Sequence, residues 1–193
     1  MAYLIKNTKL IGNMISSKNH YFRKIISLIF AISILTCPFY PLTSLAASGC
    51  ETIKTYTFEN EEWSDVYYDK YGVSFLAKLP TYQGSFLQDE SMFLYGSSGN
   101  SFYRIEVFAF SPYFPNTGKD FKNLVQQLFP GASIEWLNAK KLGAKYATKL
   151  SYKINGKINY TRVVFANTNY ISLQTDDINE ARRNNFFDGF KVY

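Results

Sequence analysis

The sequence predicts an α+β domain in which helices cover an antiparallel β-sheet, with an N-terminal signal peptide before it. Residues 71–79 alternate between apolar and polar side chains, as a half-buried strand does. The pair Asn155-Gly156 is typical of a two-residue type I′ turn between antiparallel strands. Two helices are predicted over 118–129 and 178–187. Along the chain the predicted elements are then a strand, a hairpin, a helix, an antiparallel meander, a helix and a strand, and this order favours an α+β architecture.

The first strands follow from alternation and from turn residues. The strand over 71–79 ends at Pro80, and its apolar face consists of Val73, Phe75, Ala77 and Leu79. Strands over 91–95 and 102–110 flank a turn at 97–100. On the later strand one face has Tyr103, Ile105, Val107 and Ala109, and the other has Phe102, Arg104, Glu106 and Phe108. We expect the first of these faces to be core and the other to carry a stripe capable of ion pairing.

The helix over 118–129 is predicted from one apolar stripe and two end signals. The stripe is formed by Phe121, Leu124, Val125 and Leu128, at positions i, i+3, i+4 and i+7. Thr117 can cap the first turn, and Pro130-Gly131 ends the helix.

The second half of the chain predicts an antiparallel meander and a closing helix. Its strands are expected over 133–137, 144–154, 157–166 and 170–174. Asp177 is expected to cap the last helix, with Glu180 at its third position. The final residues, 191–193, are expected to return against the sheet.

Residues 1–47 have the features of a secretory signal peptide. They hold five of the 21 basic residues and no acidic one, and the apolar run 25–35 is followed by small residues at Ala46 and Ala47. Removal of this leader leaves 16 basic residues against 15 acidic ones, so the basic excess is no evidence for nucleic-acid binding. Met14 is an alternative start that gives a leader of more ordinary length.

Two alternatives to simple cleavage remain open. Weakly polar sequence over 25–47 is long enough to act as an uncleaved membrane anchor. Residues 47–50 resemble a bacterial lipobox, which makes Cys50 a candidate for lipidation and hence for attachment to the membrane. Because Cys37 lies in the leader, Cys50 would otherwise be a single thiol without an intramolecular partner. The leader and a lipid on Cys50 are the only membrane contacts that we expect.

The rest of the chain is predicted to be one domain with a tether before it. Residues 48–66 are polar and acidic and are expected to form a flexible tether, with a short edge strand near 56–58 as the alternative for its middle. Residues 67–193 contain no repeat and no low-complexity segment, and they are expected to form a single α+β domain.

The residues that common enzymes need are largely missing. The only histidine, His20, lies in the leader, which argues against catalytic triads and histidine-containing zinc sites. No phosphate-binding glycine loop or EF-hand is present. We therefore predict no catalytic residue, no metal site and no cofactor. The acidic pairs Glu61-Glu62 and Asp176-Asp177 would point to opposite faces of a strand, so a small carboxylate-based hydrolase is only the alternative.

Aromatic residues are dense between positions 67 and 114 of this chain, which has 16 Tyr and 17 Phe in all. Most of them suit the core of a sheet. Tyr113 and Phe114 stand between two prolines in a predicted loop, and they are our candidates for partner contact. The expected partner is a protein, or an apolar or glycan ligand.

Several short segments resemble those of a known family. These are Gly72-Val73-Ser74-Phe75, Leu79-Pro80, the late hairpin and the closing segment from Asn185 to Val192. Over 67–193 the chain resembles small exported bacterial domains of the Mog1/PsbP-like fold, which typically end in an aromatic motif with Ser where this chain has Gly189. The resemblance implies an α+β sandwich and a non-catalytic binding or assembly role. It assigns no site residue.

From these observations we expect an exported, non-catalytic binding or assembly protein of the bacterial cell envelope, periplasmic or secreted. The alternatives are a membrane-anchored lipoprotein, the small hydrolase, and a secreted factor that acts on a host or a competitor.

Overall fold

The computed structural model describes residues 49–88, 91–108 and 115–193. Residues 122–130 are the described part of one compact unit, and the other described residues belong to a second unit, which contains every described strand. The elements, in chain order, are β1 (Cys50–Phe58), β2 (Glu61–Lys70), β3 (Val73–Pro80), β4 (Gly84–Gln88), β5 (Ser91–Ser98), β6 (Ser101–Phe108), α2 (Gly118–Leu128), β7 (Ser133–Trp136), the 3-10 helix η1 (Ala139–Leu142), β8 (Tyr146–Ile154), β9 (Lys157–Ala166), β10 (Asn169–Thr175), α3 (Glu180–Asp188) and β11 (Lys191–Val192).

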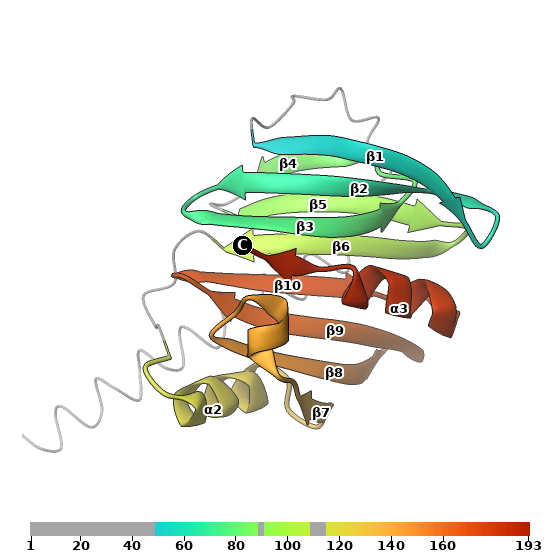
Figure 1. The fold of residues 1–193 in the computed structure, drawn as a ribbon. Coiled ribbons are helices and arrows are strands. Elements are labelled where there is room, and N and C mark those ends of the chain that lie inside the picture. The colour runs from blue at the N-terminus through green and yellow to red at the C-terminus, as the bar shows by residue number, and fades with distance from the viewer. Residues whose placement is uncertain (1–48, 89–90, 109–114) are drawn as a thin grey trace, which may run out of the picture. The chain divides into compact units, whose positions relative to one another are not determined.

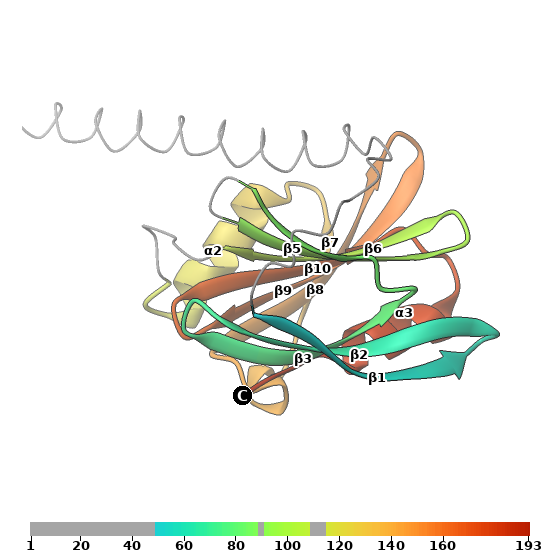
Figure 2. The same cartoon turned by 90° about the horizontal axis from the view of Figure 1, so that it is seen from above.

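The strands form two antiparallel sheets (Figure 1). The smaller sheet has four strands in the order β1-β2-β3-β11, and the larger has seven in the order β4-β5-β6-β10-β9-β8-β7. Seen from above, the strands β1 to β3 lie opposite β5, β6 and β10 (Figure 2). The main layers of this unit are therefore two sheets.

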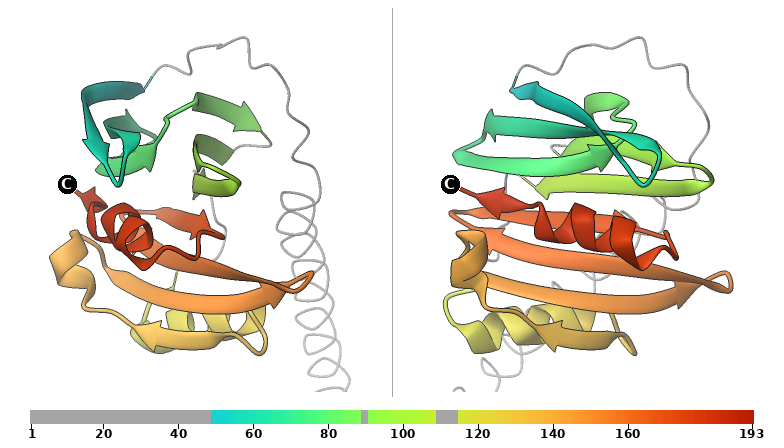
Figure 3. Two further views of the ribbon diagram at one scale, coloured as in Figure 1. Left: turned by 90° about the vertical axis from the view of Figure 1, so that its right-hand side faces the viewer. Right: turned by 45° about the vertical axis from the view of Figure 1, so that its right-hand side comes forward.

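The predicted α+β class, with helices covering the sheet, is wrong. The described chain is mostly β-strand, and its two α-helices span 11 and 9 residues. The larger sheet packs chiefly against the smaller one, and α3 lies beside β3 and β10 (Figure 3). The prediction failed because β1 has mostly exposed side chains and β4 is only five residues long, so neither has a clear apolar alternation.

The flexible tether predicted for 48–66 is also wrong for the residues that the structure describes. Residues 50–58 and 61–70 form a β-hairpin, in which Phe58 pairs with Glu61. Glu59 and Asn60 make its turn, with φ angles of 52° and 61°. Two consecutive residues with positive φ are typical of a type I′ turn, whose twist matches that of the strands. Thus this polar segment is the outer half of the smaller sheet.

The core lies between the two sheets. The predicted apolar face of β3 is confirmed, since its four side chains are buried. Opposite them lie the buried side chains of the larger sheet's inner face: Met92, Leu94, Tyr103, Ile105, Val107, Ala147, Val164, Ala166, Ile171 and Leu173. Phe186, Phe187 and Phe190 come from the end of the chain, and β11 pairs with β3 as expected for a returning C-terminus. Apolar burial of this extent is the main source of the fold's stability.

Local signals were confirmed where turn chemistry is strong. Asn155 and Gly156 have φ angles of 49° and 81° and join β8 to β9 with Ile154 opposite Lys157. At the start of α2, the hydroxyl of Thr117 accepts a hydrogen bond of 3.2 Å from the backbone N–H of Asp120. The structure thus forms the predicted late hairpin and the predicted helix cap.

Candidate functional site

The larger sheet has a second face, turned away from the core, that is aromatic at its sides and polar at its centre. Strand register places on it Phe86, Phe93, Tyr95, Phe102, Arg104, Glu106, Phe108, Trp136, Tyr146, Leu150, Tyr152, Thr161, Val163, Phe165, Tyr170, Ser172 and Gln174. Solvated sheet faces normally carry exposed polar residues. Here the central polar side chains are buried, so this second face is the candidate functional site.

A hydrogen-bonded row connects the polar residues of adjacent strands. Arg104 of β6 donates from Nη2 to Oε1 of Gln174 on β10, at 2.5 Å. Gln174 in turn donates from Nε2 to Oγ of Ser172, at 2.8 Å. All three side chains are at most 3% exposed. The row fixes the guanidinium of Arg104 in place, because a charge-assisted hydrogen bond in a desolvated setting is strong.

Glu106 lies at the centre of the second face, and no described residue forms a hydrogen bond with it. It is fully buried, directly opposite Phe93 on β5 and Ser172 on β10. Among the residues that the structure describes, neither of its carboxylate oxygens has a hydrogen-bond partner. Burial raises the pKa of Glu106 to about 7, although the positive charge of Arg104 lowers it. A buried carboxyl that the protein leaves unpaired is costly, and it is unusual outside functional sites.

Aromatic rings stack on the β4 and β5 side of this carboxyl. Phe86 stacks on Phe93 with ring centroids 5.3 Å apart, and on Tyr95 at 5.1 Å. The guanidinium of Arg104 lies 5.9 Å from the ring centroid of Phe93. Phe86 and Tyr95 are half-buried, so part of each ring surface remains accessible.

A second aromatic group lies on the β8 and β9 side. The ring of Phe121 stacks on that of Tyr146 with the ring centroids 5.4 Å apart. Tyr146 in turn stacks on Phe165, with a centroid distance of 6.2 Å. Phe165 contacts Tyr170 of β10 at 4.9 Å. Thr161 of β9 lies on the same face in register with Gln174, and its side chain is buried. The second face therefore combines apolar ring surfaces with a buried carboxyl to which no described residue donates a hydrogen bond.

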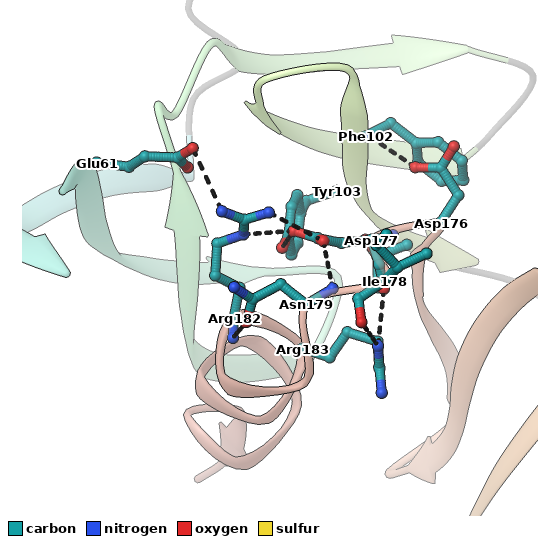
Figure 4. A network of polar contacts seen from close by, with 10 residues as sticks. Glu61, Phe102, Tyr103, Asp176, Asp177, Ile178, Asn179, Arg182 and Arg183 are labelled. Carbon is teal, nitrogen blue, oxygen red and sulfur yellow. Dashed lines mark hydrogen bonds and ion pairs between the residues drawn. The ribbon is translucent and has the colours of Figure 1, made fainter. Parts of the chain in front are cut away.

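A different polar cluster, at the end of the core, is satisfied by its own members (Figure 4). Asp177 follows β10 and is fully buried; its Oδ2 accepts from the hydroxyl of Tyr103 at 2.5 Å and from Nε of Arg182 at 2.6 Å. Its Oδ1 accepts from Nη2 of Arg182 at 3.1 Å and from the backbone N–H of Asn179 at 2.8 Å. Arg182 also lies 3.7 Å from Oε1 of Glu61 on β2. The cluster joins β2, β6 and α3, which makes it a structural clamp rather than a site for a ligand.

The ionisation of this clamp follows from its contacts. Burial disfavours the charged form of Asp177, but hydrogen bonds from Arg182, Tyr103 and Asn179 outweigh burial and hold its pKa below the ordinary value. Burial and the hydrogen bond to Asp177 raise the pKa of Tyr103. The predicted helix cap is wrong: Asn179 caps α3 by accepting from the backbone N–H of Arg182, and Asp177 instead forms the clamp.

Two of the residues singled out in the sequence lie outside the described part of the chain. These are Tyr113 and Phe114. Cys50, the candidate for lipidation, opens β1 and pairs with Tyr68. Its thiol is partly buried beside the hydroxyls of Ser85 and Tyr82, and burial raises its pKa. Lipidation of Cys50 stays a prediction.

Within residues 49–88, 91–108 and 115–193, no group of three or more His, Cys, Asp or Glu side chains is arranged to hold a metal ion. In the same part of the chain no helix is both long and apolar enough to cross a bilayer. Comparison with models of known protein families, with curated proteins and with solved structures found no match. The Mog1/PsbP-like resemblance therefore stays a prediction.

Sequence reasoning found part of the second face. It placed Phe102, Arg104, Glu106 and Phe108 together on one face of β6. It did not find Ser172 and Gln174, because pairing between β6 and β10 joins segments about 70 residues apart. The available signal was the polar alternation of Ser172 and Gln174 with Ile171 and Leu173 in a strand otherwise typical of a core.

Proposed function

We propose that this chain is an exported, non-catalytic binding protein of the bacterial cell envelope, and that it takes up the apolar part of a small ligand on the second face of the larger sheet. The single observation that carries the proposal is the buried, unpartnered Glu106 among stacked aromatic rings. Sites for small molecules are mostly apolar and aromatic, with a few polar groups that fix orientation.

Export rests on the leader over 1–47, with its acid-free basic region and apolar run. The envelope, or the space beyond it, is therefore where the protein is proposed to act. The described residues add no second indication of location.

Binding is favoured over the alternative of a carboxylate-based hydrolase by the number of acids on the second face. Among the described strand residues that lie on the second face, Glu106 is the only acidic one. Glycoside hydrolases of the common type need two carboxyl groups about 5 to 9.5 Å apart. One carboxyl with a raised pKa suits recognition of a polar group on a ligand.

The proposal predicts that Tyr95→Ala weakens the binding of N-phenyl-1-naphthylamine, a neutral apolar fluorescent probe, by about tenfold. Removal of the Tyr95 ring deletes its stacking on Phe86, in which the ring centroids are 5.1 Å apart, and part of the apolar surface. A stacked aromatic pair contributes about 1 kcal/mol of free energy in addition to that of the apolar area it buries. Fluorescence titration of the protein purified after expression of the full chain measures the dissociation constants.

The matched control is Tyr193→Ala, which removes an aromatic ring that is 61% exposed and lies on the smaller sheet. This control is expected to bind the probe as the unmodified protein does. Equal loss in both variants, or no saturable binding by the unmodified protein, would reject the second face as a ligand site.

A further inference from the structure

The carboxyl of Glu106 needs a partner that the described protein does not provide. Its neighbours across the strands are the ring of Phe93 and the hydroxyl of Ser172, which accepts from Gln174 and makes no hydrogen bond with either carboxylate oxygen. Phe108 follows on the same face of β6, two residues further along, with Tyr170 opposite it. The carboxyl is therefore bordered by the rings of Phe93 and Phe108 on two sides, and by Ser172 and Arg104 on the other two.

Arg104 does not fill this role. It is the nearest cation along the strand, but its Nη2 donates to Gln174 and its guanidinium lies near the ring of Phe93. Both oxygens of Glu106 remain without a hydrogen bond although Arg104 stands two residues away. The guanidinium of Arg104 is thus held by Gln174 and beside Phe93, and it does not hydrogen-bond to Glu106.

The chemistry of these surroundings favours a positive group. The faces of aromatic rings carry negative electrostatic potential and attract organic cations, most strongly where water is excluded. A carboxylate beside such rings adds a full negative charge, and burial strengthens its attraction to a cation. An anion would be attracted by Arg104, but that guanidinium is held by Gln174 and near the ring of Phe93, and the rings and Glu106 would repel the anion.

We infer that the ligand carries an organic ammonium group next to its apolar body, and that Glu106 receives this group while the rings of Phe93, Phe108 and Tyr170 surround it. This inference rests on the proposed function, because it names the class of ligand for the same second face. It goes further by assigning Glu106 as the residue that determines specificity.

Three probes with the same alkyl chain test the inference by isothermal titration calorimetry. They are decyltrimethylammonium, decanol and decanoate, each used below its micellar concentration and at pH 8. We expect decyltrimethylammonium to bind at least about tenfold more tightly than decanol, with decanoate the weakest, since one close charge interaction in a desolvated site changes affinity by that order. Glu106→Gln should reduce the affinity for the ammonium probe to that for decanol, and leave decanol unchanged.

The ammonium probe also reports on the ionisation of Glu106, because a quaternary ammonium does not titrate. With a carboxyl pKa of about 7, binding should weaken by about tenfold from pH 8 to pH 6, as the carboxylate is protonated. Arg104 of β6 and Lys157 of β9 are the other charged side chains that strand register places on this face, and Tyr152, whose pKa is raised by burial, is a further titratable group near Glu106. Glu62→Gln, which removes an exposed acid of β2, is the control and should preserve both the preference and the pH dependence.

The outcomes separate the two proposals. If all three probes bind equally, or if decanoate binds best, the ammonium inference is wrong while the second face remains a ligand site. If none of the probes binds, the proposed function itself fails.

Discussion

Replacing Asp177 by alanine is expected to lower the free energy of unfolding by about 3 to 5 kcal/mol, the largest loss that we predict for a single polar side chain. Asp177 is fully buried and accepts hydrogen bonds from Tyr103, Arg182 and the backbone of Asn179. Its removal leaves the guanidinium of Arg182 with only Glu61, at 3.7 Å, and leaves the buried hydroxyl of Tyr103 without an acceptor. Breaking a buried ion pair on one side is costly because the other charge stays desolvated.

Urea unfolding at pH 7 measures this loss. Glu135→Ala is the control, because Glu135 and Lys149 form an ion pair of 4.0 Å in which both side chains are largely exposed. Exposed pairs contribute little, so the control should stay within about 0.5 kcal/mol of the unmodified protein. The pKa of Asp177 is lowered, so its contribution is present above the ordinary carboxyl pKa and is lost only as the pH falls below it. A loss below about 1 kcal/mol at pH 7 would show that the clamp does not join α3 to the sheets.

Replacing Glu106 by glutamine is expected to remove a destabilisation that grows as the pH rises. The pKa of Glu106 is raised from 4.5 to about 7 in the folded chain, so between these values the folded state binds more protons than the unfolded state. Stability due to this group therefore falls as the pH rises through that window. With about 1.4 kcal/mol for each pKa unit, the accumulated cost at pH 8 is about 3 kcal/mol.

The comparison of Glu106→Gln with the unmodified protein isolates this group. The difference in their unfolding free energies should change by about 3 kcal/mol in favour of the variant between pH 4.5 and pH 8. The single histidine, His20, lies outside the described residues, so no imidazole in the described chain titrates in this window. Glu62→Gln, at an exposed position, should show no such change. A difference that is constant with pH would mean that the carboxyl of Glu106 has an ordinary pKa and is not desolvated.

The sequence predicted well those elements whose residues lie close together. The hairpin at Asn155-Gly156 and the cap at Thr117 depend on neighbouring residues alone, and both are present. Alternation also placed the core face of β3 and the two faces of β6 correctly. These features need no knowledge of distant contacts.

The fold class was missed because it depends on which segments pair. The segment around β1 has many polar and acidic residues, which are typical of a tether, but its exposed edge position tolerates them. The Tyr71-Gly72 pair, with φ angles of 54° and 73°, is a hairpin turn, whereas alternation predicts that the strand begins at Tyr71. Recognition of that turn would have indicated a strand before it and hence a second sheet.

The candidate site could be predicted only in part for the same reason. Arg104 and Glu106 are two residues apart, so their shared face is visible in the sequence. Their burial beside Gln174 and Ser172 arises from long-range pairing with β10, which no local pattern encodes. The sequence predicts a local cap for Asp177 because one of its partners, Tyr103, is 74 positions away and its hydrogen bond cannot be seen in the sequence.

The measurement that most directly tests the account is an NMR titration of the isotope-labelled protein with decyltrimethylammonium at pH 8. If the second face is the ligand site, the largest chemical-shift changes will fall on β5, β6 and β10, around Phe93, Glu106 and Ser172. Changes concentrated on β1 or α3, with these three residues unaffected, would contradict the proposed site.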